Sequence, residues 1–494
     1  DNSTRQKTLL TLKGCGEIEG AIVKVYKTEI EMLNALGELF IEYDPSVITG
    51  YNINKFDIPY LNVRFSVYIS EWPNCSCKIN GSTKVNTSSW ESSAYGTVHI
   101  SKIEAEGRIT VDMYTIILRE YGNKLERRTL DYVSKYFLNR GKHDVSALEM
   151  FRTYKELIDA INSGGDLTDV LQKQATVGKY CLEDSILCID LMKHLNTYIG
   201  LTELCTIVDV QLEDTFGRGQ QLRVENQIYR VAKKEGYVID SRNVINDKFK
   251  GGFVVDPIPG KYKYILIFDF ASLYPSIIRA YNICYTTLVP DMSDIPDESC
   301  NVIEWEETFN EGKEDEYRKN FRFRFIKKEI HEGLLPRMCA SLVNKRKDVR
   351  AKINPNNAIT NIILDQRQNA LKVSANSSFG ALGVRDGKVP LLEGAASITA
   401  MGRMLNYRCQ DYVLANTSGK IVYGDTDSIM VDLQLKDPHE CKILGDTLSK
   451  GITESLGRFP LSLEFERSLA TALFIGKKLY AGYPMTFVDK DSKK

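Results

Sequence analysis

Two carboxylates, Asp425 and Asp427, stand two residues apart where the sequence predicts the tip of a β-hairpin. Residues 421–423 and 428–433 are β-type runs, and turn-forming residues from Gly424 onward separate them. Carboxylates held at a rigid tip are good ligands for hard cations. Taken alone, this stretch could equally be a surface hairpin in which Asp serves only the turn.

A further acidic position, Asp269, follows residues 262–268, whose almost continuously apolar character predicts a buried strand. Two carboxylates on rigid sheet elements, Asp269 and Asp427, could hold two divalent cations about 4 Å apart, an arrangement used for phosphoryl transfer. Mg²⁺ prefers one or two carboxylates completed by substrate phosphates, which suits so sparse a set. Considered singly, Asp269 could also be a turn or helix-capping residue.

Basic and amide side chains lie between these two acidic positions. Two helical patterns between residues 334 and 379 are separated by an Asn- and Pro-containing turn, which predicts an antiparallel helical hairpin. Arg346 and Arg350 lie one turn apart on its first helix, and Lys372 and Asn376 one turn apart on its second. The three cations could hold a triphosphate, with bidentate contacts from Arg. For the arginine pair alone, the alternative is an ordinary solvated basic face.

The N-terminal part of the chain has an acidic set of its own. Asn52, Phe56 and Asp57 follow a short apolar strand pattern, and Tyr180 and Asp184 lie one helical turn apart. A carboxylate beside a tyrosine hydroxyl could orient a metal-bound water for phosphodiester hydrolysis. Tyr180 and Asp184 by themselves would more often be a surface pair on a helix.

The elements that must position these residues fall into two regions. Before residue 204 the sequence predicts strands at residues 21–25, 47–51 and 108–113, a helix at 29–42 and a long helical pattern at 167–198. Strands alternating with helices indicate an α/β domain, and residues 71–100 have the composition of an irregular or hairpin insertion. In the second region, Gly251 and Gly252 predict a close approach of backbone to a neighbour.

Composition limits the function classes. The 494 residues allow several domains, and 43% apolar with 26% charged residues is typical of globular proteins. No run approaches the ~18 apolar residues of a membrane span, so no membrane partner is expected. Because the net charge is −1, a nucleic-acid surface must be local. Residues 317–352, with 12 Lys or Arg and three acids, are the candidate. Eleven cysteines without regular spacing favour a reducing compartment.

Six motifs in order resemble those of family B DNA polymerases, closest to the delta-like type of eukaryotes and large DNA viruses. Four of them resemble polymerase motifs, at residues 269–277, 372–380, 423–428 and 477–480. Two others resemble the second and third motifs of the 3′–5′ proofreading exonuclease, at residues 51–57 and 180–184. The resemblance covers nearly the whole chain.

The resemblance implies a role for each matching residue. Asp269 and Asp427, with the Phe270 carbonyl, would bind two Mg²⁺ ions, and Asp425 would be a peripheral carboxylate of the catalytic set. The residues expected to bind the nucleotide are Ser272, Leu273, Tyr274, Arg346, Arg350, Lys372 and Asn376, with Tyr274 beneath the sugar and excluding a 2′-hydroxyl. Those expected to contact DNA are Gly251, Gly252, Phe379, Gly380, Lys477, Lys478 and Tyr480. The exonuclease set would be Asn52, Phe56, Asp57, Tyr180 and Asp184.

The same resemblance implies an α+β multidomain fold. An incomplete ribonuclease H-like exonuclease domain would span residues 1–204, followed by a linker and the first part of a right-hand palm with an antiparallel sheet, 205–329. Helical-hairpin fingers would follow at 330–385, and the second part of the palm at 386–494. The partners would be primer–template DNA, dNTPs, and a sliding clamp or accessory subunits. The compartment would be the nucleus or a viral replication site.

The sequence departs from the family pattern in four places. Arg350 stands where the family often has Lys, so this phosphate contact is less certain. Phe379 stands where Tyr is usual, which predicts a weaker polar check of the minor groove of the nascent base pair. The first exonuclease motif, Asp-x-Glu, and the thumb are not found, so we expect weak processivity and no proofreading from residues 1–494 alone.

The sequence disfavours three alternatives to a replicative polymerase. A non-enzymatic scaffold with a decayed site is disfavoured because Asp269, Asp427 and Lys372 are present. A protein-primed enzyme would carry long insertions around the palm, and none of obvious length lies between Asp269 and Asp427. A stand-alone nuclease is disfavoured because polymerase-like motifs occupy most of the chain.

Overall fold

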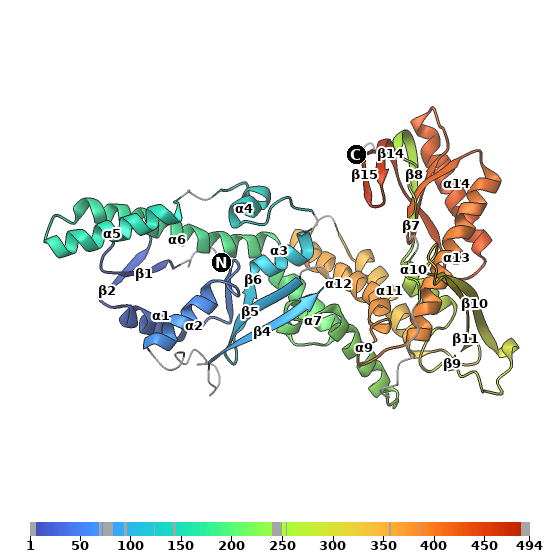
Figure 1. The fold of residues 1–494 in the computed structure, drawn as a ribbon, viewed down its shortest axis with the longest axis horizontal. Helices are drawn as coiled ribbons and strands as arrows, with labels where there is room; N and C mark the ends of the chain where they lie inside the picture. The colour runs from blue at the N-terminus through green and yellow to red at the C-terminus, as the bar shows by residue number, and fades with distance from the viewer. Residues whose placement is uncertain are drawn as a thin grey trace. The chain divides into compact units, whose positions relative to one another are not determined.

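The computed structural model describes residues 6–68, 72, 83–92, 96–122, 124–141, 145–239, 249–252, 254–354, 357–385 and 387–485. The chain forms two compact units (Figure 1). The first unit comprises Asp1–Cys205 and Gln211–Arg218, and the second comprises Thr206–Val210 and Gly219–Lys494.

The strands of the first unit form three small sheets. β1 (Thr8–Leu12) pairs in parallel with β2 (Ile22–Tyr26), and β3 (Val47–Gly50) pairs in parallel with β6 (Ile109–Asp112). β4 (Lys84–Ser92) and β5 (Gly96–Glu104) form an antiparallel hairpin. Part of the predicted insertion at residues 71–100 is therefore a hairpin, and the rest of it lies outside the described residues.

Helices surround these strands. They are α1 (Glu29–Tyr43), α2 (Asp57–Tyr68), α3 (Met113–Tyr121), α4 (Leu130–Leu138), α5 (Ala147–Ser163), α6 (Thr168–His194), α7 (Thr197–Val208) and α8 (Leu212–Gly217). α1 begins at Thr28, which forms a capping box with Glu31. The predicted strand at residues 108–113 ends at Asp112, because the Asp112 side chain accepts from the Tyr114 N–H and so begins α3. Parallel strands with interspersed helices agree with the predicted α/β character.

The second unit is built on a six-stranded antiparallel sheet with the order β15-β14-β8-β13-β12-β7. Its strands are β7 (Val254–Val255), β8 (Gly260–Phe270), β12 (Lys420–Asp425), β13 (Ser428–Asp432), β14 (Leu463–Gly476) and β15 (Leu479–Pro484). Leu266, Phe268 and Phe270 of β8 join the main core, whereas Ile265 and Ile267 join a smaller apolar cluster. Because side chains alternate along a strand, Asp269 shares the face of Ile267.

Helices cover the main-core face of this sheet. α13 (Leu392–Asn416) and α14 (Pro438–Leu456) pack on the sheet, and α10 (Leu273–Ala280) packs on α13. α11 (Leu334–Ala351) and α12 (Ala358–Leu382) pack against each other as the predicted helical hairpin, and α9 (Gln220–Lys234) packs on both. A separate sheet has the order β10 (Cys300–Phe309), β11 (Tyr317–Ile326), β9 (Leu288–Val289), and a short 3₁₀ helix, η2 (Asp297–Ser299), leads into it. None of the described helices is long and apolar enough to cross a bilayer.

Candidate active site

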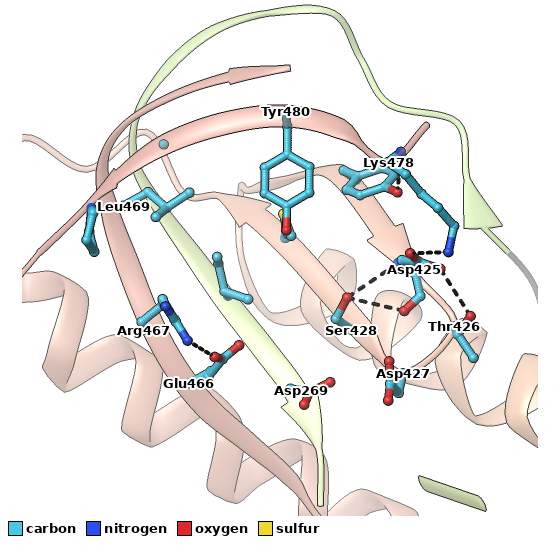
Figure 2. Close-up of a pocket in the computed structure, with 15 residues that line it drawn as sticks. Asp269, Asp425, Thr426, Asp427, Ser428, Glu466, Arg467, Leu469, Lys478 and Tyr480 are labelled. Carbon is cyan, nitrogen blue, oxygen red and sulfur yellow. Dashed lines mark hydrogen bonds and ion pairs between the residues drawn. The ribbon is translucent and has the colours of Figure 1, made fainter. Parts of the chain in front are cut away.

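Strand pairing brings the two predicted metal-binding carboxylates together. Ser428, the residue after Asp427, is the register partner of Asp269 in the β8–β13 pair, and the Phe270 N–H donates to the Asp427 carbonyl at 2.9 Å. Both carboxylates line one cavity of about 600 Å³ on the face of the sheet opposite α13 and α14 (Figure 2). The side-chain alternation of β8 therefore directs Asp269 to the face where Asp427 ends its hairpin.

The electrostatics of this cavity favour a cation. Burial, followed by the negative charges of Asp427 and Glu466, raises the pKa of Asp269 to about 7. Burial also raises the pKa of Asp427, and Asp425 and Glu466 add to the effect. The ammonium of Lys372 opposes the rise at Asp269, which shows that this predicted phosphate-binding residue lies within electrostatic range. Crowded carboxylates of this kind are stabilised by divalent cations.

The donor set suits a magnesium site that substrate completes. No cluster of three or more His, Cys, Asp or Glu with metal-binding arrangement occurs among the described residues. A magnesium ion at this site would therefore have only two carboxylate ligands from the protein, those of Asp269 and Asp427. Mg²⁺ commonly binds through one or two carboxylates with waters and phosphates in the remaining positions. The residues present fit such an ion.

Asp425 is engaged differently from Asp427. Its carboxylate lies 2.9 Å from the Lys478 ammonium, and the Thr426 hydroxyl donates to it at 3.1 Å (Figure 2). The Lys478 N–H donates to the hydroxyl of the buried Tyr423 at 2.9 Å. The β14–β15 turn that contains Lys478 is thus attached to the hairpin that contains both carboxylates.

Sequence reasoning missed Glu466. The register of β14 against β8 shifts between Phe465 and Arg467, so Glu466 lies at a β-bulge. Glu466 lines the cavity with Asp269 and is ion-paired with Arg467 (Figure 2). The Leu463-Glu-Phe-Glu alternation was a usable signal for a face with two carboxylates. The pairing of Glu464 with Asp269, which turns that face toward the cavity, leaves no sequence signal of this kind.

The start of α10 holds the predicted nucleotide-binding residues 272–274. Ser272 has the left-handed φ of 54° and begins the helix without a side-chain cap. Leu273 is 3% exposed and belongs to the main core, so only its backbone is available to a ligand. The Tyr274 ring packs on Phe379 of α12, with centroids 4.3 Å apart and planes tilted by 36°. Tyr274 thus connects α10 to the α11–α12 helical hairpin.

On the helical hairpin, the predicted triphosphate residues differ in their surroundings. Lys372 and Asn376 are both exposed on α12, in agreement with the shared face that their spacing predicted, and Gly380, predicted to contact DNA, is exposed one turn further on. Arg346 of α11 is half-buried, its Nε–H donates to Gln368 Oε1 at 3.2 Å, and burial lowers its pKa. Arg350 is exposed. Gln368, which orients Arg346, was not recognised from the sequence.

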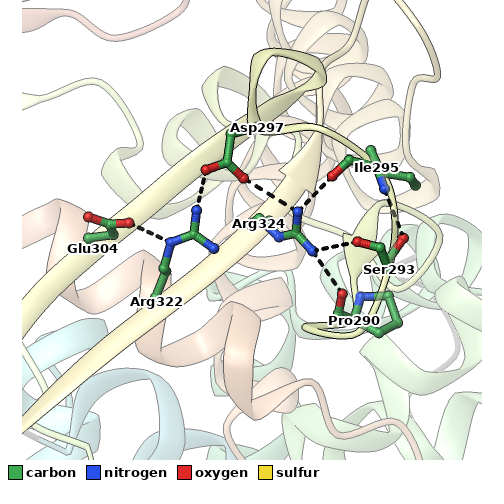
Figure 3. A network of polar contacts seen from close by, with 7 residues as sticks. All are labelled: Pro290, Ser293, Ile295, Asp297, Glu304, Arg322 and Arg324. Atoms are coloured by element: carbon green, nitrogen blue, oxygen red, sulfur yellow. Dashed lines mark hydrogen bonds and ion pairs between the residues drawn. The ribbon is translucent and has the colours of Figure 1, made fainter.

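The alternating basic strand is largely neutralised by internal partners. Arg322 is ion-paired with Asp297 and Glu304, at 2.6 Å for Glu304 (Figure 3). Arg324 is buried, and it donates to the carbonyls of Pro290 and Ile295 at 2.9 and 2.7 Å. The positive excess of residues 317–352 is therefore smaller at β11 than the count suggests.

The remaining predicted DNA-contacting residues surround the hairpin tip. An added Cβ at Gly252 would lie 3.0 Å from Thr426 Cγ2 and 3.1 Å from the Tyr274 hydroxyl, so the backbone does approach closely there. An added Cβ at Gly251 would meet nothing within 4 Å, so the close approach predicted for that residue is wrong. Lys477 is ion-paired with Asp256 at 2.8 Å. Tyr480 stacks on Phe474, with centroids 5.4 Å apart.

In the first unit, the predicted exonuclease carboxylates lie within electrostatic range of one cysteine. Burial, followed by the charges of Asp184, Asp112 and Asp57, raises the pKa of Cys188 to about 12. Asp112, which sequence reasoning missed, accepts from the backbone N–H groups of Asn52 and Asn54 at 2.7 and 3.1 Å. Its position between a strand and a helix was an available capping signal.

The other residues of the predicted exonuclease set differ in how far they are exposed. Phe56 is 67% exposed, and Tyr180 is half-buried one turn before Asp184 on α6. The loop that contains Asn52 and Asn54 is hydrogen-bonded to the Asp112 carboxylate. The pKa of Asp112 is raised, mainly because this residue is buried. The structure therefore places Asp57 and Asp184 in one neighbourhood.

Comparison with known proteins defines the class. The profile of DNA polymerase family B matches residues 210–494, and the profile of the family B exonuclease domain matches residues 1–133. The chain belongs to DNA polymerase family B.

Its similarity to individual members extends over the whole chain. It is 34% identical to the DNA polymerase delta catalytic subunit of Plasmodium falciparum, over 100% of this chain and 44% of that protein. It is 32% identical to DNA polymerase 120R of Invertebrate iridescent virus 3, over 94% of this chain and 46% of that protein. The family B polymerase of the archaeon Pyrobaculum calidifontis has a similar structure, with a TM-score of 0.64, 27% identity, and coverage of 91% and 52%. The chain spans about half the length of these relatives.

Proposed function

We propose that this chain provides the catalytic centre for template-directed DNA synthesis. The observation that supports this most directly is the β8–β13 pairing, which sets Asp269 beside Asp427 on an open sheet face. Two bound Mg²⁺ ions would lower the pKa of the primer 3′-hydroxyl and neutralise the pyrophosphate that leaves the dNTP. Asp269, Asp427 and the Phe270 carbonyl would hold these ions.

The side chains around the carboxylates would bind and orient the substrates. Lys372 and Arg346 would neutralise the triphosphate, with Asn376 and Arg350 as further contacts and the backbone of Ser272 and Leu273 beneath it. Tyr274 would support the sugar and exclude a 2′-hydroxyl. Such positioning and charge neutralisation would supply most of the rate, because little covalent chemistry is left to the protein.

The DNA would lie along the rim of this site. Gly251 and Gly252 would contact the template strand, and Phe379 and Gly380 would lie beside the nascent base pair. Lys477, Lys478 and Tyr480 would hold the primer–template duplex. In this arrangement residues 205–329 and 386–494 are the palm and residues 330–385 the fingers. A sliding clamp or accessory subunits would be further partners, in the nucleus or at a viral replication site.

The test is primer extension by the full-length protein. With a labelled primer–template, Mg²⁺ and one dNTP at a time, we expect one-nucleotide extension only when the dNTP complements the template. If the protein binds the primer–template but does not extend the primer under these conditions, the proposal is refuted.

We further propose that residues 1–204 belong to a 3′–5′ proofreading exonuclease. The supporting observation is that the loop before Asp57 is hydrogen-bonded to Asp112 through the Asn52 and Asn54 N–H groups, with Asp57, Asp112 and Asp184 all within electrostatic range of Cys188. Asn52, Phe56 and Tyr180 would position the 3′ end and the attacking water. In the full-length protein, Asp184→Ala should abolish hydrolysis of single-stranded DNA from its 3′ end and leave primer extension intact. Hydrolysis at the wild-type rate would refute this assignment.

A further inference from the structure

We propose that Glu307, acting through Arg403, is a positioning residue that holds the backbone of residues 250–252 against the catalytic hairpin. This inference rests on the proposed polymerase function, since its effect is exerted on that reaction. It assigns a role to a buried ion pair that no motif identified in the sequence.

Glu307 is a buried carboxylate with three donors. It lies on β10, and its side chain is 2% exposed. The Lys250 N–H donates to its Oε2 at 2.9 Å, the Trp305 indole N–H donates to its Oε1 at 2.9 Å, and the Arg403 guanidinium pairs with Oε1. A charge is retained at such depth only when paired and hydrogen-bonded, so the donors and the carboxylate depend on one another.

Arg403 extends this contact to the carbonyls of the same segment. Its Nη1 donates to the carbonyl oxygens of Lys250 and Gly251, at 2.9 and 2.8 Å. The Thr399 hydroxyl, one turn earlier on α13, donates to the Lys250 carbonyl at 3.0 Å. The N–H and C=O of Lys250 are thus both fixed, one by β10 and the other by α13. The planar guanidinium of Arg403 suits this role because its Nη2 binds the Glu307 carboxylate while its Nη1 donates to the two backbone carbonyls.

The fixed segment lies directly against the catalytic residues. An added Cβ at Gly252 would lie 3.0 and 3.1 Å from Thr426 atoms and 3.1 Å from the Tyr274 hydroxyl. Thr426 separates Asp425 from Asp427, and Val254, just beyond the segment, is the register partner of Asp425. A shift of residues 250–252 toward the hairpin would therefore collide with Thr426, and a shift away would open the surface proposed for the template.

Glu307 and Arg403 therefore differ in role from the residues that line the catalytic cavity. Neither Glu307 nor Arg403 lines the cavity that contains Asp269 and Asp427. Loss of the Glu307 carboxylate removes the acceptor of the Lys250 N–H and the ion-pair partner that orients Arg403 toward the Lys250 and Gly251 carbonyls. Because a misplacement of about 1 Å can reduce a rate ~100-fold, the bound DNA would react more slowly even where binding survives.

The experiment compares Glu307→Gln with a matched control in the full-length protein. Glu306→Gln changes the adjacent residue of the same strand, whose side chain is 48% exposed and pairs with Arg318. Rapid-quench extension of a primer–template gives a burst amplitude, which counts active molecules, and a burst rate. We expect Glu307→Gln to lower the burst rate about tenfold or more. Glu306→Gln should keep the wild-type rate.

A second, milder variant distinguishes a loss of positioning from a simple loss of folding. Thr399→Val removes one hydrogen bond to the Lys250 carbonyl without exposing a buried charge, and should lower the burst rate about threefold. If Glu307→Gln reduces only the burst amplitude or thermal stability and leaves the burst rate unchanged, Glu307 is merely structural and the inference is wrong. If the wild-type protein itself shows no extension, the proposed function fails instead, so the two failures are distinguishable.

Discussion

The ammonium of Lys478 lies 2.9 Å from the carboxylate of Asp425, so a residue proposed to hold DNA is paired with one of the two hairpin carboxylates. Lys478 is exposed and Asp425 is half-buried. The ion pair with Lys478 also distinguishes Asp425 from Asp427, whose carboxylate has no such cation partner in the described part of the chain. The two carboxylates of the hairpin therefore have different surroundings.

The Lys478–Asp425 pair predicts that substitution of Asp425 and substitution of Lys478 change the affinity for DNA in opposite directions. Asp425→Asn should release Lys478 for a phosphate and tighten primer–template binding a few-fold at low salt, because each phosphate neutralised releases counterions. Lys478→Met should weaken binding and reduce the salt dependence by about one charge. Fluorescence anisotropy titrations at several salt concentrations measure both. Weaker binding by Asp425→Asn would contradict this account of the pair.

The raised pKa of Asp269, about 7, predicts that stability falls with rising pH in metal-free buffer. Between the ordinary pKa of Asp and about 7, the folded protein binds a proton at this site and the unfolded chain does not. Unfolding free energy is therefore lost as pH rises through this window. Asp269→Asn should be stabilising, by about 1–2 kcal/mol more at pH 8 than at pH 5 once partial hydration of the carboxyl is allowed for. Urea denaturation in EDTA tests this, and an equal gain at both pH values would refute it.

The two arginines of α11 proposed to bind the nucleotide, Arg346 and Arg350, should differ in importance. Arg346 is half-buried and oriented by Gln368, whereas Arg350 is exposed. A pre-oriented guanidinium loses less freedom on binding phosphate than an exposed one. We expect Arg346→Ala to raise the Kd for the incoming dNTP about tenfold or more, and Arg350→Ala about threefold or less. Single-turnover kinetics at varied dNTP concentration measure both, and the reverse order would be inconsistent with the site described above.

Phe379 packs on Tyr274 but has no hydroxyl to offer the minor groove. We expect Phe379→Tyr to lower misincorporation, because a polar group is restored beside the nascent base pair and a mismatch would leave it unpaired. The change keeps the ring that contacts Tyr274, so stability should be little affected. Misincorporation rates measured with each wrong dNTP test this, and unchanged rates would count against a polar check at this position.

Local elements were predictable because their signals are local. The periodicity of residues 334–379 predicted the α11–α12 hairpin, and the face of Lys372 and Asn376 followed from helical spacing. The proximity of Asp269 and Asp427 depends on the pairing of β8 with β13, which periodicity cannot specify; only the resemblance to a family predicted it.

Other features of the site depend on tertiary structure and were missed. Glu466 lies two residues after Glu464, the register partner of Asp269, so it reaches the cavity through strand pairing that the sequence does not specify. Glu307 differs from its neighbour Glu306 only in the face of β10 on which it lies, and its burial follows from packing between β10 and α13. The basic run on β11 was overestimated because its acidic partners, Asp297 and Glu304, are distant in sequence.

The most direct test compares Asp427→Ala with Asp425→Ala in primer extension by the full-length protein. Asp427 lies beside Asp269 at the site proposed for Mg²⁺, and Asp425 faces Lys478. We predict that Asp427→Ala abolishes extension while primer–template affinity stays close to wild type, and that Asp425→Ala retains measurable extension. Sustained extension by Asp427→Ala would contradict the central claim that Asp269 and Asp427 form the catalytic centre.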